Sequence, residues 1–161
     1  MRLALSSIAA ALLFTTFALP ARAEDAPAAE GNARDKSGEE LLNQFMTALL
    51  IADEGASAKE VMKVTHKSKW AKDGSDLSPD LRRFSFHKAH DNAKFYASPV
   101  KITRVRETSM SGVGFKETAE AGSVVDYFVK KKEGVNGMPA PVKVFFPKGG
   151  GAPKILDMGS L

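Results

Sequence analysis

Residues 141–161 read PVKVFFPKGGGAPKILDMGSL, and this stretch predicts a β-hairpin. Apolar residues alternate with Lys143 in the run 142–146, a Gly- and Pro-rich turn covers 147–153, and a second apolar run covers 155–158. Both runs place apolar side chains on both faces, which is typical of strands covered on two sides. We therefore expect helices against one face of this sheet and another cover over the second face.

The preceding third of the chain also has strand periodicity. From Pro99 onward the pattern predicts strands over 100–107, 115–120 and 123–132, separated by turns. The alternation shifts by one residue at Val105, which indicates a β-bulge. These strands and the terminal hairpin make an antiparallel sheet of four to five strands.

Helical periodicity dominates the region before the sheet. Capping boxes beginning at Ser37 and Ser57 predict the start of one helix that runs to about Ala52 and of a shorter second helix. Ser78, followed by Pro79 and an acidic residue, predicts the start of a third helix that ends near residue 93. The expected fold class is α+β, with three N-terminal helices packed on a curved antiparallel sheet.

The N-terminal segment has the pattern of a secretory signal peptide over residues 1–23. Arg2 precedes an apolar stretch, and Ala21-Arg22-Ala23 fits a cleavage site, although an uncleaved membrane anchor is the alternative. Residues 24–36 lack large apolar side chains and are expected to form a flexible leader before a single domain over 37–161. We expect export to the periplasm or the extracellular space.

Composition narrows the classes of function. The sequence has no cysteine, so a lipid anchor on cysteine is not expected, and neither are disulfides. Removing Arg2 and Arg22 with the signal peptide lowers the basic count from 23 to 21, against 19 acidic residues, which leaves a formal charge of +2. A charge this small predicts no nucleic-acid partner.

Three helices followed by a bent antiparallel sheet, with the last strand ending in 157–161 (DMGSL), resemble the nuclear transport factor 2-like (NTF2-like) superfamily. The resemblance covers residues 37–161, and the related cystatin-like fold is its nearest alternative. It implies a conical fold whose sheet curls around an apolar pocket. Members of the superfamily include isomerases, dehydratases, cyclases, non-catalytic ligand binders and protein-assembly modules.

Asp126 and Asp157 lie on the two strongest strands, and the resemblance implies that one of them could act as a base in an apolar pocket. Asp126 and Tyr127 are neighbours in a strand, so they point to opposite faces. The alternative is that Asp126 pairs with Lys130, Lys143 or Lys154 across the sheet. The expected ligand-contacting residues are Phe128, Phe145, Ile155, Asp126, Asp157 and Tyr96.

Two further groups of residues are candidate sites. His87, His90 and Asp91 could share a helix face and meet a metal ion, but capping and surface hydrogen bonding suffice to explain them, so we predict neither a metal nor a cofactor. Lys59, Lys63 and Lys67 are four residues apart and predict a basic stripe. The stripe is either a solvated face or a contact with anionic lipid or polysaccharide of the cell envelope.

The sequence contains no complete set of catalytic residues. We therefore predict an exported non-catalytic binding or protein-interaction module. The second sheet face would be covered by a small apolar ligand, a protein partner or a second copy of the chain. The alternative is a small-molecule isomerase, dehydratase or cyclase that uses Asp126 or Asp157.

Overall fold

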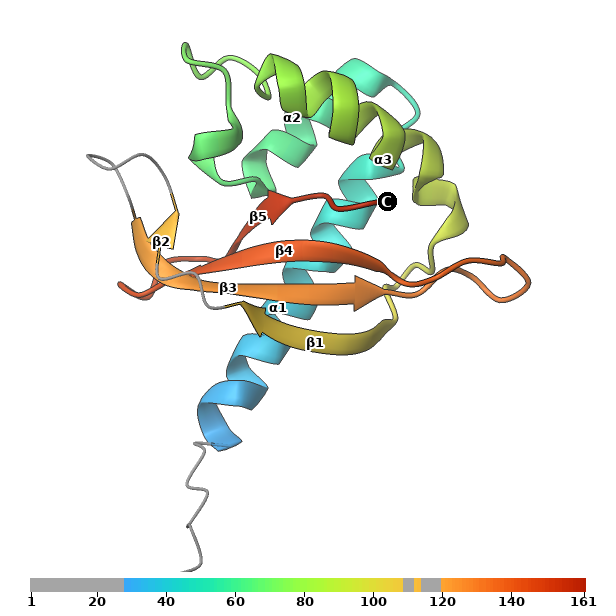
Figure 1. Ribbon diagram of the computed structural model, residues 1–161. Coiled ribbons are helices and arrows are strands. Elements are labelled where there is room, and N and C mark those ends of the chain that lie inside the picture. The colour runs from blue at the N-terminus through green and yellow to red at the C-terminus, as the bar shows by residue number, and fades with distance from the viewer. Residues whose placement is uncertain (1–27, 109–111, 114–119) are drawn as a thin grey trace, which may run out of the picture.

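The computed structural model describes residues 28–108, 112–113 and 120–161, and its fold is α+β, which confirms the predicted class (Figure 1). The helices are α1 (Ala28–Leu49), α2 (Glu54–Val64) and α3 (His87–Asn92). The shorter helical segments are η1 (Lys67–Lys69), η2 (Leu81–Phe86) and η3 (Ala93–Phe95). The strands are β1 (Ile102–Thr108), β2 (Gly112–Val113), β3 (Glu120–Val129), β4 (Ala140–Pro147) and β5 (Lys154–Asp157).

The sheet is antiparallel and has the order β1-β3-β4-β5, while the short β2 pairs with the beginning of β3. The predicted terminal hairpin is confirmed, because β4 pairs with β5 and Val144 lies opposite Ile155. The register of β1 against β3 shifts between Ile102 and Arg104, close to the irregularity expected at Val105. Gly112 and Val113, expected in a turn, form β2 instead.

Of the strand expected over 115–120, only Glu120 lies among the described residues, and it begins β3. The remainder of that expected strand lies outside them. The expected signal peptide, at residues 1–23, also lies outside the described residues. Within the described part of the chain, no helix combines the length and the apolar character that a membrane span requires.

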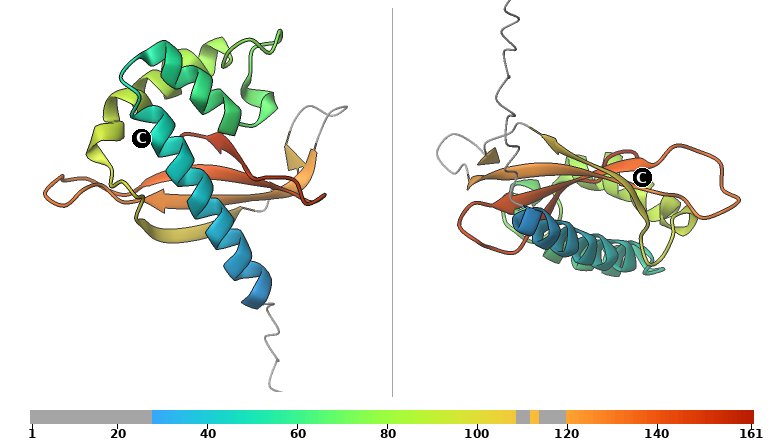
Figure 2. Two further views of the ribbon diagram at one scale, coloured as in Figure 1. Left: turned by 180° about the vertical axis from the view of Figure 1, so that it is seen from behind. Right: turned by 90° about the horizontal axis from the view of Figure 1, so that it is seen from below.

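The main core lies between α1 and one face of the sheet, which we call the inner face. α1 crosses behind the sheet in Figure 1 and in front of it in the left view of Figure 2. Alternate residues of β3 and β4 point into this core because successive strand side chains alternate in direction. Buried members of the core include Leu42, Phe45, Met46, Leu49, Val125, Tyr127, Val129, Val142 and Val144.

The starts of the first two helices differ from the prediction. α1 begins at Ala28, so residues 28–36, expected in a flexible leader, are helical. Ser37 lies inside α1, where its hydroxyl donates to the Arg34 carbonyl, and the capping box expected there is wrong. The additional N-terminal turns of α1, before Ser37, lie beside the sheet, where Tyr127 Oη donates to the Arg34 carbonyl over 3.3 Å.

α2 begins at Glu54, ahead of the expected start at Ser57. Asp53 is its N-cap, and the Asp53 carboxylate accepts a 2.7 Å hydrogen bond from the Ala56 N–H. The Ser57 hydroxyl instead donates to the Ala48 carbonyl over 2.8 Å, so it joins α2 to α1 in the interior. The capping box at Ser57 is therefore wrong, because a tertiary hydrogen bond engages that side chain.

The third helix begins where the sequence predicted, with Ser78 Oγ accepting from the Leu81 N–H over 3.4 Å. It widens into the π-helix η2, narrows to α3 and ends in the 3-10 turn η3. This helical run buries Phe86, Ala89 and Ala93 against the core. α2 and α3 lie on the β5 side of the sheet in Figure 1.

Candidate binding pockets beside the sheet

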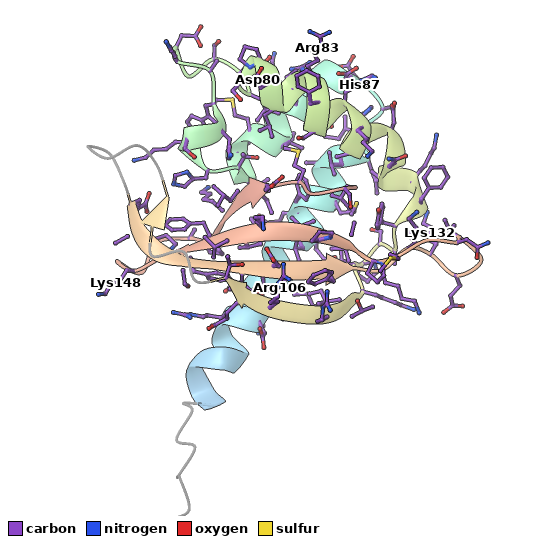
Figure 3. The ribbon with its side chains drawn as sticks, viewed as in Figure 1. Asp80, Arg83, His87, Arg106, Lys132 and Lys148 are labelled. Carbon is purple, nitrogen blue, oxygen red and sulfur yellow. The ribbon has the colours of Figure 1, made fainter. Side chains whose placement is uncertain are left out.

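Asp126 lies on the sheet face opposite α1, the outer face, and its side chain is completely buried. Its Oδ2 accepts from Arg106 through Nη2 at 2.5 Å and through Nε at 3.1 Å. Its Oδ1 accepts from Lys143 Nζ at 3.0 Å. Arg106 comes from the edge strand β1 and is labelled where it lies beside β3 in Figure 3. Of the three lysines that are candidate cross-strand partners of Asp126, Lys143 is the one that pairs with it.

These contacts determine the protonation state of Asp126. Burial of the carboxyl raises its pKa, but hydrogen bonds from Arg106 and Lys143, together with their charges, outweigh burial and leave the pKa below its ordinary value. The carboxylate therefore stays ionised and is neutralised by two cations. A proton-transfer base needs the opposite arrangement, with a raised pKa and a free oxygen facing substrate.

Tyr127 faces the inner side, as predicted from its place next to Asp126. Burial raises the pKa of its hydroxyl, and the nearby charge of Asp35 acts in the same direction. Tyr127 and Asp126 therefore cannot act on one substrate, because the sheet separates them.

The other residues expected to contact a ligand are dispersed. Phe128 lies on the outer face under Arg104, whose guanidinium carbon is 3.8 Å from the ring centroid. Ile155 belongs to the main core. Asp157 accepts from the Gly159 N–H at 3.0 Å. Tyr96 is buried, which raises the pKa of its hydroxyl, and it lines a separate cavity of about 210 Å³.

The histidines considered as candidate metal ligands, His87 and His90, make hydrogen bonds or lie beside acidic side chains instead. His90 Nε2 lies 2.8 Å from the Ile51 carbonyl oxygen and joins α3 to the end of α1. His87, labelled in Figure 3, is exposed, and its Nδ1 lies 3.5 Å from Glu54. Over residues 28–108, 112–113 and 120–161, no cluster of histidine and acidic side chains could hold a metal ion.

A large hollow lies between α1, α2 and the loop that joins β4 to β5. We call it the α1–α2 groove, and its volume is about 900 Å³. Apolar side chains and polar ones both line it, and the polar set includes charged residues of either sign. Its apolar lining is Leu41, Ala48, Ile51, Val64, Ala152 and Pro153, and its polar lining is Ser37, Glu40, Asn43, Gln44, Thr47, Glu60, Lys63 and Lys154.

A second hollow of about 270 Å³ adjoins the groove, and we call it the His66 pocket. α2 ends at Val64 with Thr65 as its C-cap, and the chain then lies along β5, where the His66 N–H donates to the Ile155 carbonyl over 2.8 Å. The pocket is lined by Lys63, Thr65, His66, Lys67, Trp70, Glu120, Phe145, Pro147, Gly151, Ala152 and Lys154.

His66 is a rigid part of this pocket, with only 4% of its side chain exposed. Its Nδ1 accepts from the Ser68 N–H at 3.2 Å, which assigns the proton of the neutral ring to Nε2, 3.3 Å from Glu120 Oε2. The ring meets Phe145 edge to face at 5.1 Å. The imidazole is therefore oriented on both nitrogens and on one face.

The basic stripe expected from the spacing of Lys59, Lys63 and Lys67 does not form on one helix. A stripe through Lys59, Lys63 and Lys67 requires one continuous helix, but α2 ends before Lys67, which belongs to η1. The turn at Thr65 and His66 instead places Lys63 and Lys67 in the lining of one pocket, together with Lys154 from β5.

Comparisons of the chain with protein-family models, with curated proteins and with solved structures found no match.

The sequence patterns did not predict either hollow. His66 and Trp70 carried no recognisable motif, and the β4–β5 loop is far from them in the chain. Thr65 and His66 could have signalled a turn, because the apolar helical repeat ends before them.

Proposed function

We propose that this protein is an exported, non-catalytic binding module built on an NTF2-like scaffold, and that its ligand occupies the α1–α2 groove. The observation that carries the proposal is the groove itself. Its volume of about 900 Å³ is at the upper end of the range of roughly 300–1,000 Å³ for small-molecule sites. The signal-peptide pattern at residues 1–23 supports export.

The lining of the groove suits an amphipathic molecule. Ala48, Ile51 and Val64 supply apolar contact from two helices, while Asn43 and Gln44 supply amide groups on the α1 side. Asn43 is already anchored, since its Oδ1 accepts from the Val100 N–H at 2.8 Å. Because the side chains that form the walls belong largely to packed helices, a ligand would meet a surface that is already formed.

The scaffold assignment draws on element order and on the sheet. Helices precede an antiparallel sheet, and the terminal hairpin is its last pair of strands. The catalytic alternative lacks a favourable observation, because Asp126 is buried between Arg106 and Lys143 with a lowered pKa. We therefore do not propose proton-transfer chemistry on this residue.

The test is titration of the purified protein with N-phenyl-1-naphthylamine, a neutral apolar probe whose fluorescence rises in an apolar site. We expect saturable binding, weakened about tenfold by Gln44→Phe, because an aromatic ring at this groove-lining position fills the site. Glu39→Phe is the matched control, since Glu39 is an exposed residue of α1 outside the groove lining.

Circular dichroism would verify that both variants keep the wild-type fold. Absence of saturable binding to the wild-type protein overturns the proposal. Equal binding by the two folded variants also overturns it, because the probe would then be bound elsewhere.

A further inference from the structure

We infer that the His66 pocket binds the carboxylate of a small apolar acid, and that the hydrocarbon part of this acid extends into the α1–α2 groove. This inference rests on the proposed function and specifies the class of its ligand. The two hollows adjoin each other, because Lys63, Ala152 and Lys154 line both. One ligand can therefore occupy both.

The distribution of charge gives the ligand its direction. Three lysines and one glutamate line the His66 pocket, whereas two lysines and two glutamates line the groove. With His66 neutral, the formal charge of the lining is +2 in the pocket and zero in the groove. An anionic head is therefore favoured at the pocket end, and the balanced, partly apolar groove suits the tail.

The lysines differ in how far they are already engaged. Lys154 Nζ donates to the Lys63 carbonyl over 2.8 Å, so it is held between the two hollows. Lys63 Nζ lies 2.5 Å from Glu60. Lys67, in η1, makes no ion pair with another described residue. Its ammonium is thus the cation of the pocket that an incoming carboxylate can recruit.

Apolar side chains, two of them aromatic, form part of the walls around these lysines. Phe145 is fully buried, and His66 covers it. Trp70, Pro147 and Ala152 complete the apolar lining. Glu120, the single acid of the lining, is turned to His66 Nε2. An acid whose carboxylate lies beside Lys67 would therefore place its hydrocarbon chain against aromatic rings. A hydrated inorganic anion is disfavoured in the same place, because it would lose water without gaining apolar contact.

The test uses Trp70, the only tryptophan of the chain, as a reporter within the pocket. Its emission is followed in 150 mM salt during titration with octanoate, with octanamide and with octylammonium. We expect saturable changes, with octanoate binding about tenfold more tightly than the neutral amide and octylammonium binding most weakly.

Lys67→Gln should weaken octanoate about tenfold and leave octanamide unchanged, because only the charged head loses a partner. Lys59→Gln is the matched control, since Lys59 is an exposed lysine of α2 outside both hollows. It should leave both affinities unchanged.

Three results would overturn the inference. They are equal affinity for octanoate and octanamide, equal weakening of octanoate by the two lysine variants, and binding to phosphatidylglycerol vesicles without binding to free octanoate. Retained saturable binding of N-phenyl-1-naphthylamine in any of these cases shows that the groove proposal survives. Loss of that binding as well shows that both proposals fail.

Discussion

The two faces of the sheet come from the same strands but are stabilised differently. On the inner face, Val125, Tyr127 and Val144 join one continuous core with α1. On the outer face, Val124, Phe145 and Leu156 form a separate small apolar cluster, and further along the same strands a buried carboxylate is held by two cations. Strand alternation is common to both faces, so the difference lies in what covers them.

This contrast shows that burial in this protein has two sources. A helix excludes water from the inner face, so apolar side chains there gain the full hydrophobic contribution. On the outer face, long charged side chains cover the strands with their alkyl stems while their heads stay near water. Arg104 and Arg106 both lie over the Phe128 ring in this way. The outer face is therefore the one whose stability depends on charge.

The largest expected effect is on the inner face. Phe45→Ala should lower the free energy of unfolding by about 3–5 kcal/mol, because Phe45 is fully buried in the main core and its loss leaves a cavity. Phe128→Ala on the outer face should cost about 1–2 kcal/mol, since it loses partial burial and two cation–π contacts. Urea unfolding of both variants measures the difference. Equal costs would abolish the contrast between the faces.

The next effect concerns the charge on the outer face. Asp126→Asn should cost about 1–3 kcal/mol at pH 7, because Arg106 and Lys143 lose the carboxylate that accepts from both. Asp80→Asn is the control, because Asp80 is exposed and its side chain makes no capping hydrogen bond. Figure 3 shows Asp80 at the far side of the helical region from Arg106. Its change should stay within about 0.5 kcal/mol.

The effect of Asp126→Asn on the free energy of unfolding should depend on pH. The pKa of Asp126 is lower in the folded protein than its ordinary value of 3.8, so the ionised carboxylate stabilises the fold throughout the range above that value. As the pH falls below 3.8 and through the folded pKa, this stabilisation is lost. The difference in unfolding free energy between wild type and Asp126→Asn should be constant from pH 7 to about 5 and shrink below about 4. A difference that grows on acidification would contradict the ion-pair account.

The smallest effect tests how closely α1 approaches the inner face. Alanine normally favours a helix over glycine by about 1 kcal/mol, but a Cβ at Gly38 would lie 2.3 Å from Tyr127 Oη. Tyr127 is fully buried and cannot easily move, so Gly38→Ala should cost about 1–2 kcal/mol net. Gly55→Ala in α2 is the control and should stay within about 0.5 kcal/mol, because the gain in helix propensity is opposed by a close approach of 3.3 Å to Asp53 Oδ1, the oxygen that caps α2. A stabilising Gly38→Ala would mean that α1 is not tightly seated.

Local sequence patterns predicted which helices and strands form better than they predicted the residues at which these elements begin and end. The alternation in 142–146 and the glycine-rich turn after it located the terminal hairpin, and Ser78 located the start of the third helix. Both capping boxes failed for one reason. A serine followed by a glutamate can cap a helix, but Ser37 and Ser57 found other hydrogen-bond acceptors, one of them in a different helix.

The candidate site was less predictable than the fold. Phe145 was expected to contact a ligand and does line the His66 pocket, but Asp126 and Ile155 line neither that pocket, nor the α1–α2 groove, nor the cavity beside Tyr96. The pocket joins residues 63–70 to residues 145–154, and no spacing rule connects segments so far apart. Tertiary contacts make them neighbours, among them the hydrogen bonds from the His66 N–H to the Ile155 carbonyl and from Lys154 Nζ to the Lys63 carbonyl.

The amino-acid sequence by itself determined the period of each element, the α+β class and the opposite directions of Asp126 and Tyr127, because these depend on residues a few positions apart. The tertiary structure alone decided which cations neutralise Asp126, where α1 begins, and that lysines from α2, η1 and β5 line one pocket. Those outcomes depend on contacts between distant segments, and such contacts exist only once the sheet and helices have packed.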